Sequence, residues 1–218
     1  MKLGFLGGTG VEAKGLALRF AAAGASVVLG SRSPERAAKA AEDCNVVLGA
    51  TLIRGLDNAQ MVDASDIVFL AVPYDQAIDA VNGIRSVLTP RNIVVDITVP
   101  IIFRQGHAEY VESGELSNAE TIARHLPEGV PLVAAFKTIP AAILADLKTG
   151  LDCDVFVCGD TQEAKNAVMA AASAIPALRA LDAGPLRTAR TLERMTVLAV
   201  ELNRHYRKKG ARFQVKGL

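Results

Sequence analysis

The sequence predicts an α/β protein built around a doubly wound, mostly parallel β-sheet and ending in a short helical segment. Short apolar runs rich in Val, Ile, Leu and Phe alternate with helix-like patterns along most of the 218 residues. The runs lack the apolar–polar alternation of a half-exposed strand, which indicates strands covered on both faces. Strand–helix units repeated with short connections are typical of a parallel sheet with helices on both sides.

The elements follow in order from the residue patterns. Gly24 is expected to end the first helix, Pro34 lies in the first turn of the second, and Thr161 caps a later one. Strands are predicted at residues 2–7, 26–31, 66–72, 93–98, 131–136 and 154–158, and helices at residues 10–23, 34–43, 75–88, 118–126, 140–147 and 161–174.

Residues 99–118 interrupt this rhythm with about twenty residues of mixed pattern that follow a strand. Loops of this length in compact domains are usually functional or mobile. The segment is therefore interpreted either as cover for an active site or as an excursion over the surface.

The pattern changes again in the last part of the chain. Residues 188–206 predict one long helix, and Val197 and Val200 extend its apolar face beyond a single stripe. Such a helix often packs against a second subunit, which favours a homodimer. We therefore expect an α/β domain over residues 1–183 and a helical segment for subunit or ligand contact over residues 184–218. The predicted stripe consists of Leu192, Met195, Ala199, Leu202 and Tyr206.

The composition excludes several classes of protein. Half of the residues are hydrophobic and 22% are charged, which is typical of a folded globular protein rather than a disordered one. The net charge of +1 argues against general nucleic-acid binding, and no apolar run reaches the length of a membrane span. The Gly-rich turn directly after Met1 and Lys2 leaves no room for a signal peptide, and three cysteines make no disulfide framework. We expect a soluble cytoplasmic protein.

The near-neutral total hides a basic C-terminal part. Residues 187–218 carry nine Lys or Arg and two Glu, a balance of +7, whereas the remainder carries a balance of −6. This part is interpreted either as a solvated surface or subunit contact, or as a surface that attracts a polyanionic ligand.

A glycine-rich turn follows the first predicted strand and opens the first helix. After Gly7, the residues Gly8, Gly10 and Ala13 fit the pattern G-x-G-x-x-A. The first glycine permits a tight turn, the second lets the backbone approach a pyrophosphate, and the small third residue lets the helix pack on the strand. The helix N-terminus adds free N–H groups and a partial positive charge. The context predicts a Rossmann dinucleotide-binding fold, with Gly7 and Gly8 among the cofactor-binding residues.

The end of the second predicted strand indicates which dinucleotide binds. Proteins that bind NAD usually place an Asp or Glu there, where it accepts hydrogen bonds from the ribose. This sequence instead has Ser31, Arg32 and Arg36. Two guanidinium groups favour the 2′-phosphate of NADP by roughly 3–6 kcal/mol, so the predicted cofactor is NADP. Residues 1–183 are therefore predicted to form an NADP-binding Rossmann-like domain, and residues 184–218 a helical segment for substrate or dimer contact. The alternative is that residues 31–36 only cap a surface helix.

The ends of the predicted strands at residues 66–72 and 93–98 should border the nicotinamide. In an open α/β sheet the ligand crosses the carboxyl ends of the strands where their order reverses. Pro73 and Pro100 turn the chain away after these strands. Val72, Tyr74 and Val99 are then either cofactor contacts or ordinary strand-end packing.

Other chemistries lack support in the residues. The three histidines have no ligand spacing for a metal, and Cys153 and Cys158 should face opposite sides of a strand. There is no G-x-S-x-G nucleophile elbow and no Tyr-x-x-x-Lys pair, so no proton donor for carbonyl reduction is evident. We predict no metal site and no catalytic side chain.

Six stretches of the chain carry a resemblance to a known family. They are GGTG at 7–10, KGLALR at 14–19, GSR at 30–32, TIPAA at 138–142, VCGD at 157–160 and LDAGPL at 181–186. Together they resemble the NADPH-dependent coenzyme F420 reductases (F420:NADP oxidoreductases). The resemblance implies hydride exchange between C4 of the nicotinamide and C5 of the deazaflavin F420 as co-substrate, which needs juxtaposed rings more than acid–base groups. It also gives the basic C-terminal part a partner, because the deazaflavin tail carries a phosphate and glutamates.

The resemblance implies site residues and shows departures from the family. Ala13 stands where a Gly is familiar, Tyr74 where a Trp is familiar, and Lys137 where a His is familiar just before TIPAA. The 101–118 loop matches poorly, and the last two departures lie on the acceptor side, which leaves the acceptor open. Contacts with NADP are implied at Thr9, Gly10, Val11, Glu12, Ser31, Arg32 and Arg36, and contacts near the nicotinamide at Val72, Val99 and Ala141.

Tyr74, Lys137, Arg187 and Arg190 are the candidate contacts of the acceptor. Lys137 is interpreted either as a hydrogen-bond donor to the acceptor's ring oxygen or phosphate, or as a strand-end lysine in water. Arg187 and Arg190 would contact an anionic substrate, and Arg190 alone of the two matches the family. Two alternatives to F420 chemistry stay open here: an NADPH-dependent flavin or ferric reductase, and a non-catalytic NADP(H)-sensing protein.

Overall fold

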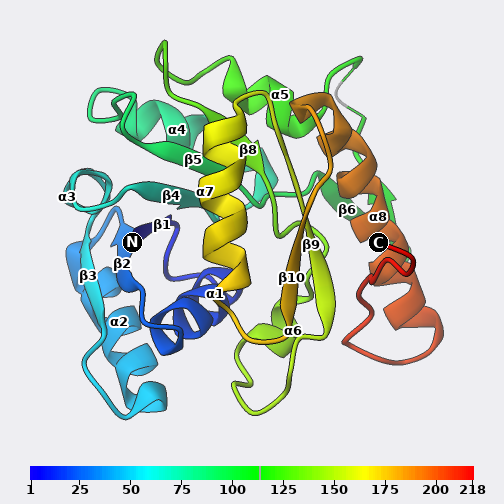
Figure 1. Ribbon diagram of the computed structural model, residues 1–218, viewed down its shortest axis with the longest axis horizontal. Helices are drawn as coiled ribbons and strands as arrows, with labels where there is room; N and C mark the ends of the chain where they lie inside the picture. The colour runs from blue at the N-terminus through cyan, green and yellow to red at the C-terminus, as the bar shows by residue number, and fades with distance from the viewer. Residues whose placement is uncertain (113) are drawn as a thin grey trace.

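The computed structural model describes residues 1–112 and 114–218 and has the predicted α/β architecture (Figure 1). One eight-stranded sheet has the order β10-β9-β8-β5-β4-β1-β2-β3. All neighbouring strands are parallel except β8 and β9, so β9 and β10 run opposite to the other six. The strands are β1 (Lys2–Leu6), β2 (Ser26–Ser31), β3 (Ile53–Asp57), β4 (Ile67–Leu70), β5 (Ile93–Asp96), β8 (Leu132–Ala134), β9 (Cys153–Gly159) and β10 (Leu178–Asp182).

Helices cover both faces of this sheet, which confirms the doubly wound arrangement. Side chains of α1, α2, α6 and α7 pack into one hydrophobic cluster, and those of α3, α4, α5 and α8 pack into a second cluster on the other face. The helices are α1 (Val11–Ala22), α2 (Pro34–Leu48), α3 (Asn58–Asp63), α4 (Ala77–Ile84), α5 (Asn118–Ala123), α6 (Ala141–Leu144), α7 (Gln162–Ser173) and α8 (Ala189–His205), with 3-10 turns η1 (Tyr74–Gln76) and η2 (Leu186–Thr188).

The strands alternate their side chains between the two clusters. Phe5 of β1 joins the first cluster and Leu6 joins the second, as the period of two requires. Cys153 and Cys158 of β9 divide in the same way, which confirms that they face opposite sides of the sheet. The rings of Phe5 and Phe69 stack with their centroids 4.7 Å apart at the centre of the first cluster.

Two strands of the eight-stranded sheet escaped the sequence prediction. Strand β3 reads IRGLD and carries a glycine at its centre, which weakens the strand pattern. A Cβ at Gly55 would lie 2.2 Å from the carbonyl carbon of Ala37, so the close approach of α2 requires glycine there. Strand β10 reads LRALD, with too little apolar character to be recognised from sequence alone.

The segment 99–118 was expected as an irregular loop, and that expectation is wrong in part. It contains a two-stranded antiparallel hairpin of β6 (Ile101–Arg104) and β7 (His107–Tyr110). Gln105 and Gly106 form its turn with φ of +49° and +82°, the left-handed conformation that a tight hairpin needs. The hairpin packs against α8 at one side of the molecule (Figure 1).

Over the described residues, none of the helices combines the length and apolar character that crossing a bilayer requires.

Candidate functional site

The glycine-rich turn joins β1 to α1 at the carboxyl edge of the sheet. Gly7 has φ of +82°, and a Cβ there would lie 2.6 Å from the side chain of Val72. A Cβ at Gly8 would lie 2.8 Å from the Leu29 side chain on β2. A Cβ at Gly10 would meet only ordinary contacts at 3.5 Å or more, so the protein itself does not require glycine there. Space for a ligand is the remaining reason for a glycine at residue 10.

The N-terminus of α1 has no side-chain cap, a feature that it shares with α4, α6, α7 and α8. Gly10 occupies the N-cap position and supplies no side-chain hydrogen bond. By contrast, Ser33 caps α2, and Ser117 with Glu120 forms a capping box on α5. The first-turn N–H groups of α1 therefore remain available to an anion.

The predicted 2′-phosphate residues lie together at the end of β2 and the start of α2. The Ser33 hydroxyl accepts a hydrogen bond from the Arg36 backbone N–H at 3.3 Å, so the segment does cap the helix. The cap uses neither arginine side chain. Arg32 and Arg36 are exposed, and neither guanidinium has a hydrogen bond or ion pair within the described part of the chain. The Ser31 hydroxyl accepts from the Ser33 N–H at 3.2 Å and faces the same region.

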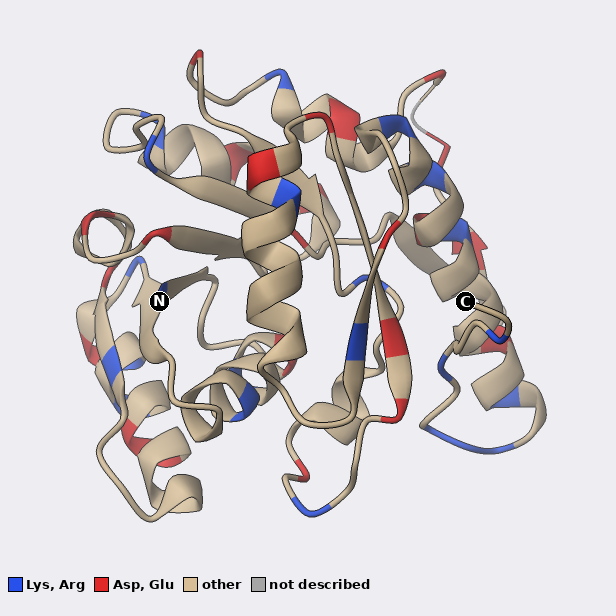
Figure 2. Ribbon diagram, viewed as in Figure 1, with Lys and Arg blue, Asp and Glu red and all other residues tan. Residues whose placement is uncertain are grey.

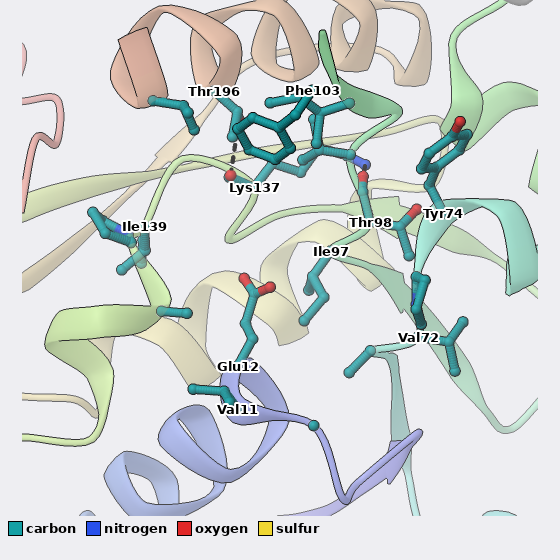
Figure 3. Close-up of a pocket in the computed structure, with 18 residues that line it drawn as sticks. Val11, Glu12, Val72, Tyr74, Ile97, Thr98, Phe103, Lys137, Ile139 and Thr196 are labelled. Atoms are coloured by element: carbon teal, nitrogen blue, oxygen red, sulfur yellow. Dashed lines mark hydrogen bonds between the residues drawn. The ribbon is translucent and has the colours of Figure 1, made fainter. Parts of the chain in front are cut away.

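A cavity of about 380 Å³ opens where the N-terminus of α1 meets the carboxyl ends of β4 and β5 (Figure 3). The hairpin and α8 close it from the opposite side. Predicted residues that line it are Gly10, Val11, Glu12, Val72, Tyr74, Val99, Lys137 and Ala141. Thr9 lies in the adjoining turn, and Arg187 and Arg190 are not among the lining residues.

Several lining residues were not predicted, because they come from distant elements. Thr196 and Val200 stand one turn apart on α8, and Phe103 reaches the cavity from β6. Val200 was interpreted as part of a subunit contact, although its spacing from Thr196 already placed both on one helical face. The other unpredicted lining residues are Ala71, Pro73, Ile97, Thr98, Ile101, Ile139 and Pro140.

Lys137 lies in a buried ion network rather than in water. Its side chain is 1% exposed, and its ammonium lies 2.7 Å from Asp96 Oδ2 and 3.4 Å from Glu193 Oε1. The ammonium also donates to the carbonyl of Thr98. Burial disfavours the charged form, but the Asp96 and Glu193 carboxylates outweigh it and raise the pKa of Lys137. The interpretation as a solvated strand-end lysine is therefore wrong, and the ammonium is already engaged by the protein.

Glu193, which sequence analysis did not single out, connects this network to the wall of the cavity. It is fully buried on α8 and accepts a hydrogen bond from the Tyr110 hydroxyl of β7 at 2.8 Å. It also accepts from the backbone N–H groups of Asn118 and Ala119 at the start of α5, each at 3.2 Å. Burial and the bond to Glu193 raise the pKa of Tyr110. One carboxylate thus joins the hairpin, α5 and α8.

The two predicted acceptor arginines have different surroundings. Arg190 donates to Glu112 Oε2 at 2.7 Å and to the carbonyls of Gly114 and Glu115. Arg187 is exposed and has no charged partner among the described residues. Figure 2 shows that several basic positions, coloured blue, follow one another along α8. Arg190 therefore holds the segment after the hairpin, whereas Arg187 is free.

Two of the motifs that carry the resemblance meet in space. Arg19, in KGLALR, donates to the carbonyls of Leu144, Ile143 and Thr149, each at 2.9 Å, and to that of Asp146. These carbonyls belong to α6 and the turn after it, and α6 begins at Ala141 of TIPAA. Arg19 therefore fixes the part of the cavity wall that TIPAA supplies.

Glu12 brings a carboxyl group into the same cavity. It is half-buried, and its side chain points from α1 toward the layer that Lys137, Phe103 and Thr196 form (Figure 3). Removal of the carboxylate from water raises the pKa of Glu12 to about 8, because this cost exceeds the attraction of the Lys137 ammonium. The negative charge of Asp96 adds to the rise.

The chain is similar to a group of proteins of known name. Residues 2–100 match the family described as NADP oxidoreductase coenzyme F420-dependent. An F420-dependent NADP reductase from Methanothermobacter thermautotrophicus is 35% identical over all of this chain and 96% of its own length. One from Methanocaldococcus jannaschii is 34% identical over all of this chain and 99% of its own length. A crystal structure from Arthrobacter sp. FB24, described as a candidate F420-dependent NADP reductase, has a TM-score of 0.82 at 23% identity and covers 98% of both chains.

Proposed function

Because the chain belongs to the family of F420-dependent NADP reductases, we propose that it transfers a hydride between NADP(H) and the deazaflavin coenzyme F420. The observation that carries the proposal is the juxtaposition of an uncapped helix N-terminus with a cavity of apolar walls at the carboxyl edge of the sheet. The flavin, ferric and sensor alternatives are not favoured, since three relatives that match over the full chain are named F420-dependent NADP reductases.

The residues present fit NADP. Arg32 and Arg36 are exposed and unpaired, so both guanidinium groups are free to bind the 2′-phosphate, with the Ser31 hydroxyl beside them. The N–H groups of the first turn of α1, with Thr9 and Gly10 before them, would hold the pyrophosphate. When bound, NADPH supplies the hydride from C4 of its nicotinamide.

The cavity walls would hold the reacting rings against each other. Val72, Val99 and Ala141 line the cavity and would position the nicotinamide. Tyr74 and Phe103 offer aromatic faces for the deazaflavin. These side chains exclude water from the space between the rings, and their main contribution is proximity and orientation.

The acceptor's charged tail requires a separate anchor. We assign this role to Arg187, which is exposed and unpaired, with Arg190 beside it on η2 and α8. Lys137 contributes through its position: its ammonium fixes Asp96 and Glu193 and so shapes the wall on the acceptor side.

Residues 184–218 would act as a substrate and dimer segment appended to a nucleotide domain of residues 1–183. Leu192 and Ala199 pack inside the chain, whereas Leu198, Leu202 and Tyr206 of the same region are 52%, 36% and 65% exposed. This exposed apolar face fits a homodimer of a cytoplasmic enzyme, and sedimentation equilibrium would then give twice the chain mass.

The experiment that tests the proposed function is spectrophotometric. The purified protein is mixed with NADPH and oxidised F420, and the visible absorbance of the deazaflavin is followed, with FMN and ferric citrate in parallel cuvettes. The proposal expects rapid bleaching of the deazaflavin alone. Reduction of FMN or iron while the deazaflavin keeps its colour would show that F420 is not the acceptor. NADPH binding without oxidation by any acceptor would show that the protein is not an oxidoreductase.

A further inference from the structure

Glu12 places an ionisable group inside the cavity that hydride transfer alone does not use. It is the second residue of α1, two residues after Gly10, the last residue of the glycine-rich turn before the helix. Its carboxyl makes no hydrogen bond to any residue of the described chain, and it points into the cavity rather than along the helix surface (Figure 3). A helix of the same length offers a contrast: Glu163 holds the second position of α7 and is exposed.

The groups around the Glu12 carboxyl are mostly apolar. Val11, Ile97 and Ile139 line the cavity beside it. Such walls replace water without offering hydrogen bonds, so they favour the neutral acid over the carboxylate.

The charged groups that face Glu12 do not compensate for this loss of water. Lys137, after β8, is the nearby cation, but its ammonium is bound by Asp96 at the end of β5 and by Glu193 of α8. The three groups together carry one net negative charge. Tyr74 of η1 also lines the cavity, and Cys158 of β9 is buried close enough to the Lys137 ammonium to interact with its charge. A neutral Glu12 carboxyl at pH 7 follows from this arrangement, in line with its raised pKa of about 8.

We propose that Glu12 is the acid of this site, protonated while NADPH is bound and ionised once NADP⁺ has formed. The inference rests on the proposed function. As the hydride leaves C4 of the nicotinamide and bonds to C5 of the deazaflavin, the acceptor gains two electrons and a negative charge on its pyrimidine ring. The Glu12 proton passes to the ring nitrogen N1, which completes the reduced acceptor. The Glu12 carboxylate that remains lies beside the positively charged NADP⁺ ring, and solvent restores its proton after the products leave.

This assignment has a consequence for binding that does not depend on the acceptor. A carboxylate beside the nicotinamide attracts the positively charged NADP⁺ ring and not the neutral NADPH ring. NADP⁺ should therefore lower the pKa of Glu12 and release its proton on binding, whereas NADPH should leave the acid protonated. By linkage, the affinity for NADP⁺ should rise with pH up to the free pKa of the group, and the affinity for NADPH should not.

Calorimetric titration of the intact protein with NADP⁺ and with NADPH between pH 6.5 and 7.5 tests the inference. The expected result is an affinity for NADP⁺ that rises about tenfold over this unit of pH, while that for NADPH stays flat. Titration in buffers of different ionisation enthalpy should show release of about one proton with NADP⁺ alone. Glu12→Gln keeps the shape and the neutral charge of the acid, so it should fold normally and should abolish both effects. The matched control Glu163→Gln should keep both.

A second measurement examines the proton transfer itself. In single turnovers of NADPH with oxidised F420, Glu12→Gln should slow the reaction about 10²–10⁴-fold, which is the usual contribution of a general acid. In ¹³C NMR, the Glu12 carboxyl of the wild type should titrate near pH 8 in the free protein and markedly lower with NADP⁺.

The outcomes separate the inference from the proposed function. If the tenfold rise in NADP⁺ affinity persisted in Glu12→Gln, or if the wild-type affinity did not depend on pH, Glu12 would not be the acid of this site. So would an unchanged single-turnover rate in that variant. If F420 were not reduced at all, the proposed function would fail while the NADP⁺ titrations still decided the state of Glu12.

Discussion

The two ends of the candidate site handle charge in opposite ways. At the phosphate end, Arg32 and Arg36 are exposed and have no partner in the described chain. At the ring end, Lys137, Asp96 and Glu193 are buried and paired with one another. The unpaired arginines are free to bind a ligand, whereas the paired charges stabilise the protein itself. A charged residue near a cavity therefore indicates ligand binding only when its own chain leaves it free.

The largest effect is expected where this comparison predicts free charge. Replacing both Arg32 and Arg36 with Ala should weaken NADP binding by roughly 3–6 kcal/mol, on the order of 10²–10⁴-fold, because two charge-assisted hydrogen bonds to the 2′-phosphate are lost. NAD lacks that phosphate and should bind nearly as before. Calorimetric titration with both nucleotides measures the difference.

The same titration has a control within the same helix. Lys39 stands one turn after Arg36, but its ammonium is paired with Glu42 at 3.0 Å and Asp43 at 3.1 Å. Lys39→Ala should leave the preference for NADP intact. Equal losses for NADP and NAD in the arginine variant would show that these residues do not bind the 2′-phosphate.

The phosphate end could be predicted from sequence because its parts are close together in the chain. The turn from Gly7 to Ala13 and the segment from Ser31 to Arg36 each follow one strand directly, so local patterns fix their geometry. The ring end could not be predicted in this way. Lys137 meets Asp96 across 41 positions, and Tyr110 meets Glu193 across 83. No local pattern records contacts of that range.

The fold shows the same division between local and distant causes. The six predicted strands are confirmed, since each is a continuous apolar run covered on both faces. Strand β3 escaped because the glycine at residue 55 is required by the close approach of the α2 backbone, and the sequence of the strand itself does not reveal that neighbour. The hairpin within residues 99–118 escaped because the exposed residues of β7 are polar and its support comes from α8.

The second effect in size should fall on stability at the ring end. Glu193→Ala removes the acceptor of the Tyr110 hydroxyl and two backbone N–H groups, and it leaves Lys137 with one carboxylate. Loss of one partner from a buried charged pair costs about 3–5 kcal/mol. Urea unfolding of this variant should show a free energy of unfolding reduced by that amount.

A second glutamate on α8 supplies the matched comparison. Glu201 also binds the hairpin, accepting from the Ala108 N–H at 2.7 Å, but its side chain is 28% exposed and water can replace the bond. Glu201→Ala should cost about 1 kcal/mol. If both variants lost the same stability, burial of the network would not be what holds the wall, and the contrast between the two ends would lose its physical basis.

The smallest effect should appear at Arg187 and Arg190, where the two kinds of charge stand three residues apart. Arg187 is free and should contact the anionic acceptor directly, so Arg187→Ala should raise the KM for F420 about two- to tenfold. Arg190 is held by Glu112, so Arg190→Ala should raise it less. The affinity for NADPH should stay unchanged in both, as measured by steady-state kinetics and by titration.

Glu112→Gln sharpens this last comparison, because it weakens the hold on Arg190 without removing the arginine. If Glu112 only keeps the Arg190 guanidinium from binding F420, the Glu112→Gln variant should lower the KM for F420. Added salt should then abolish this decrease, because the attraction is between exposed charges. If Arg190 acts by keeping the segment after the hairpin in place, the variant should instead raise KM, as Arg190→Ala does. An unchanged KM for F420 in all three variants would show that these arginines do not bind the substrate. The basic C-terminal part would then be interpreted as a subunit contact.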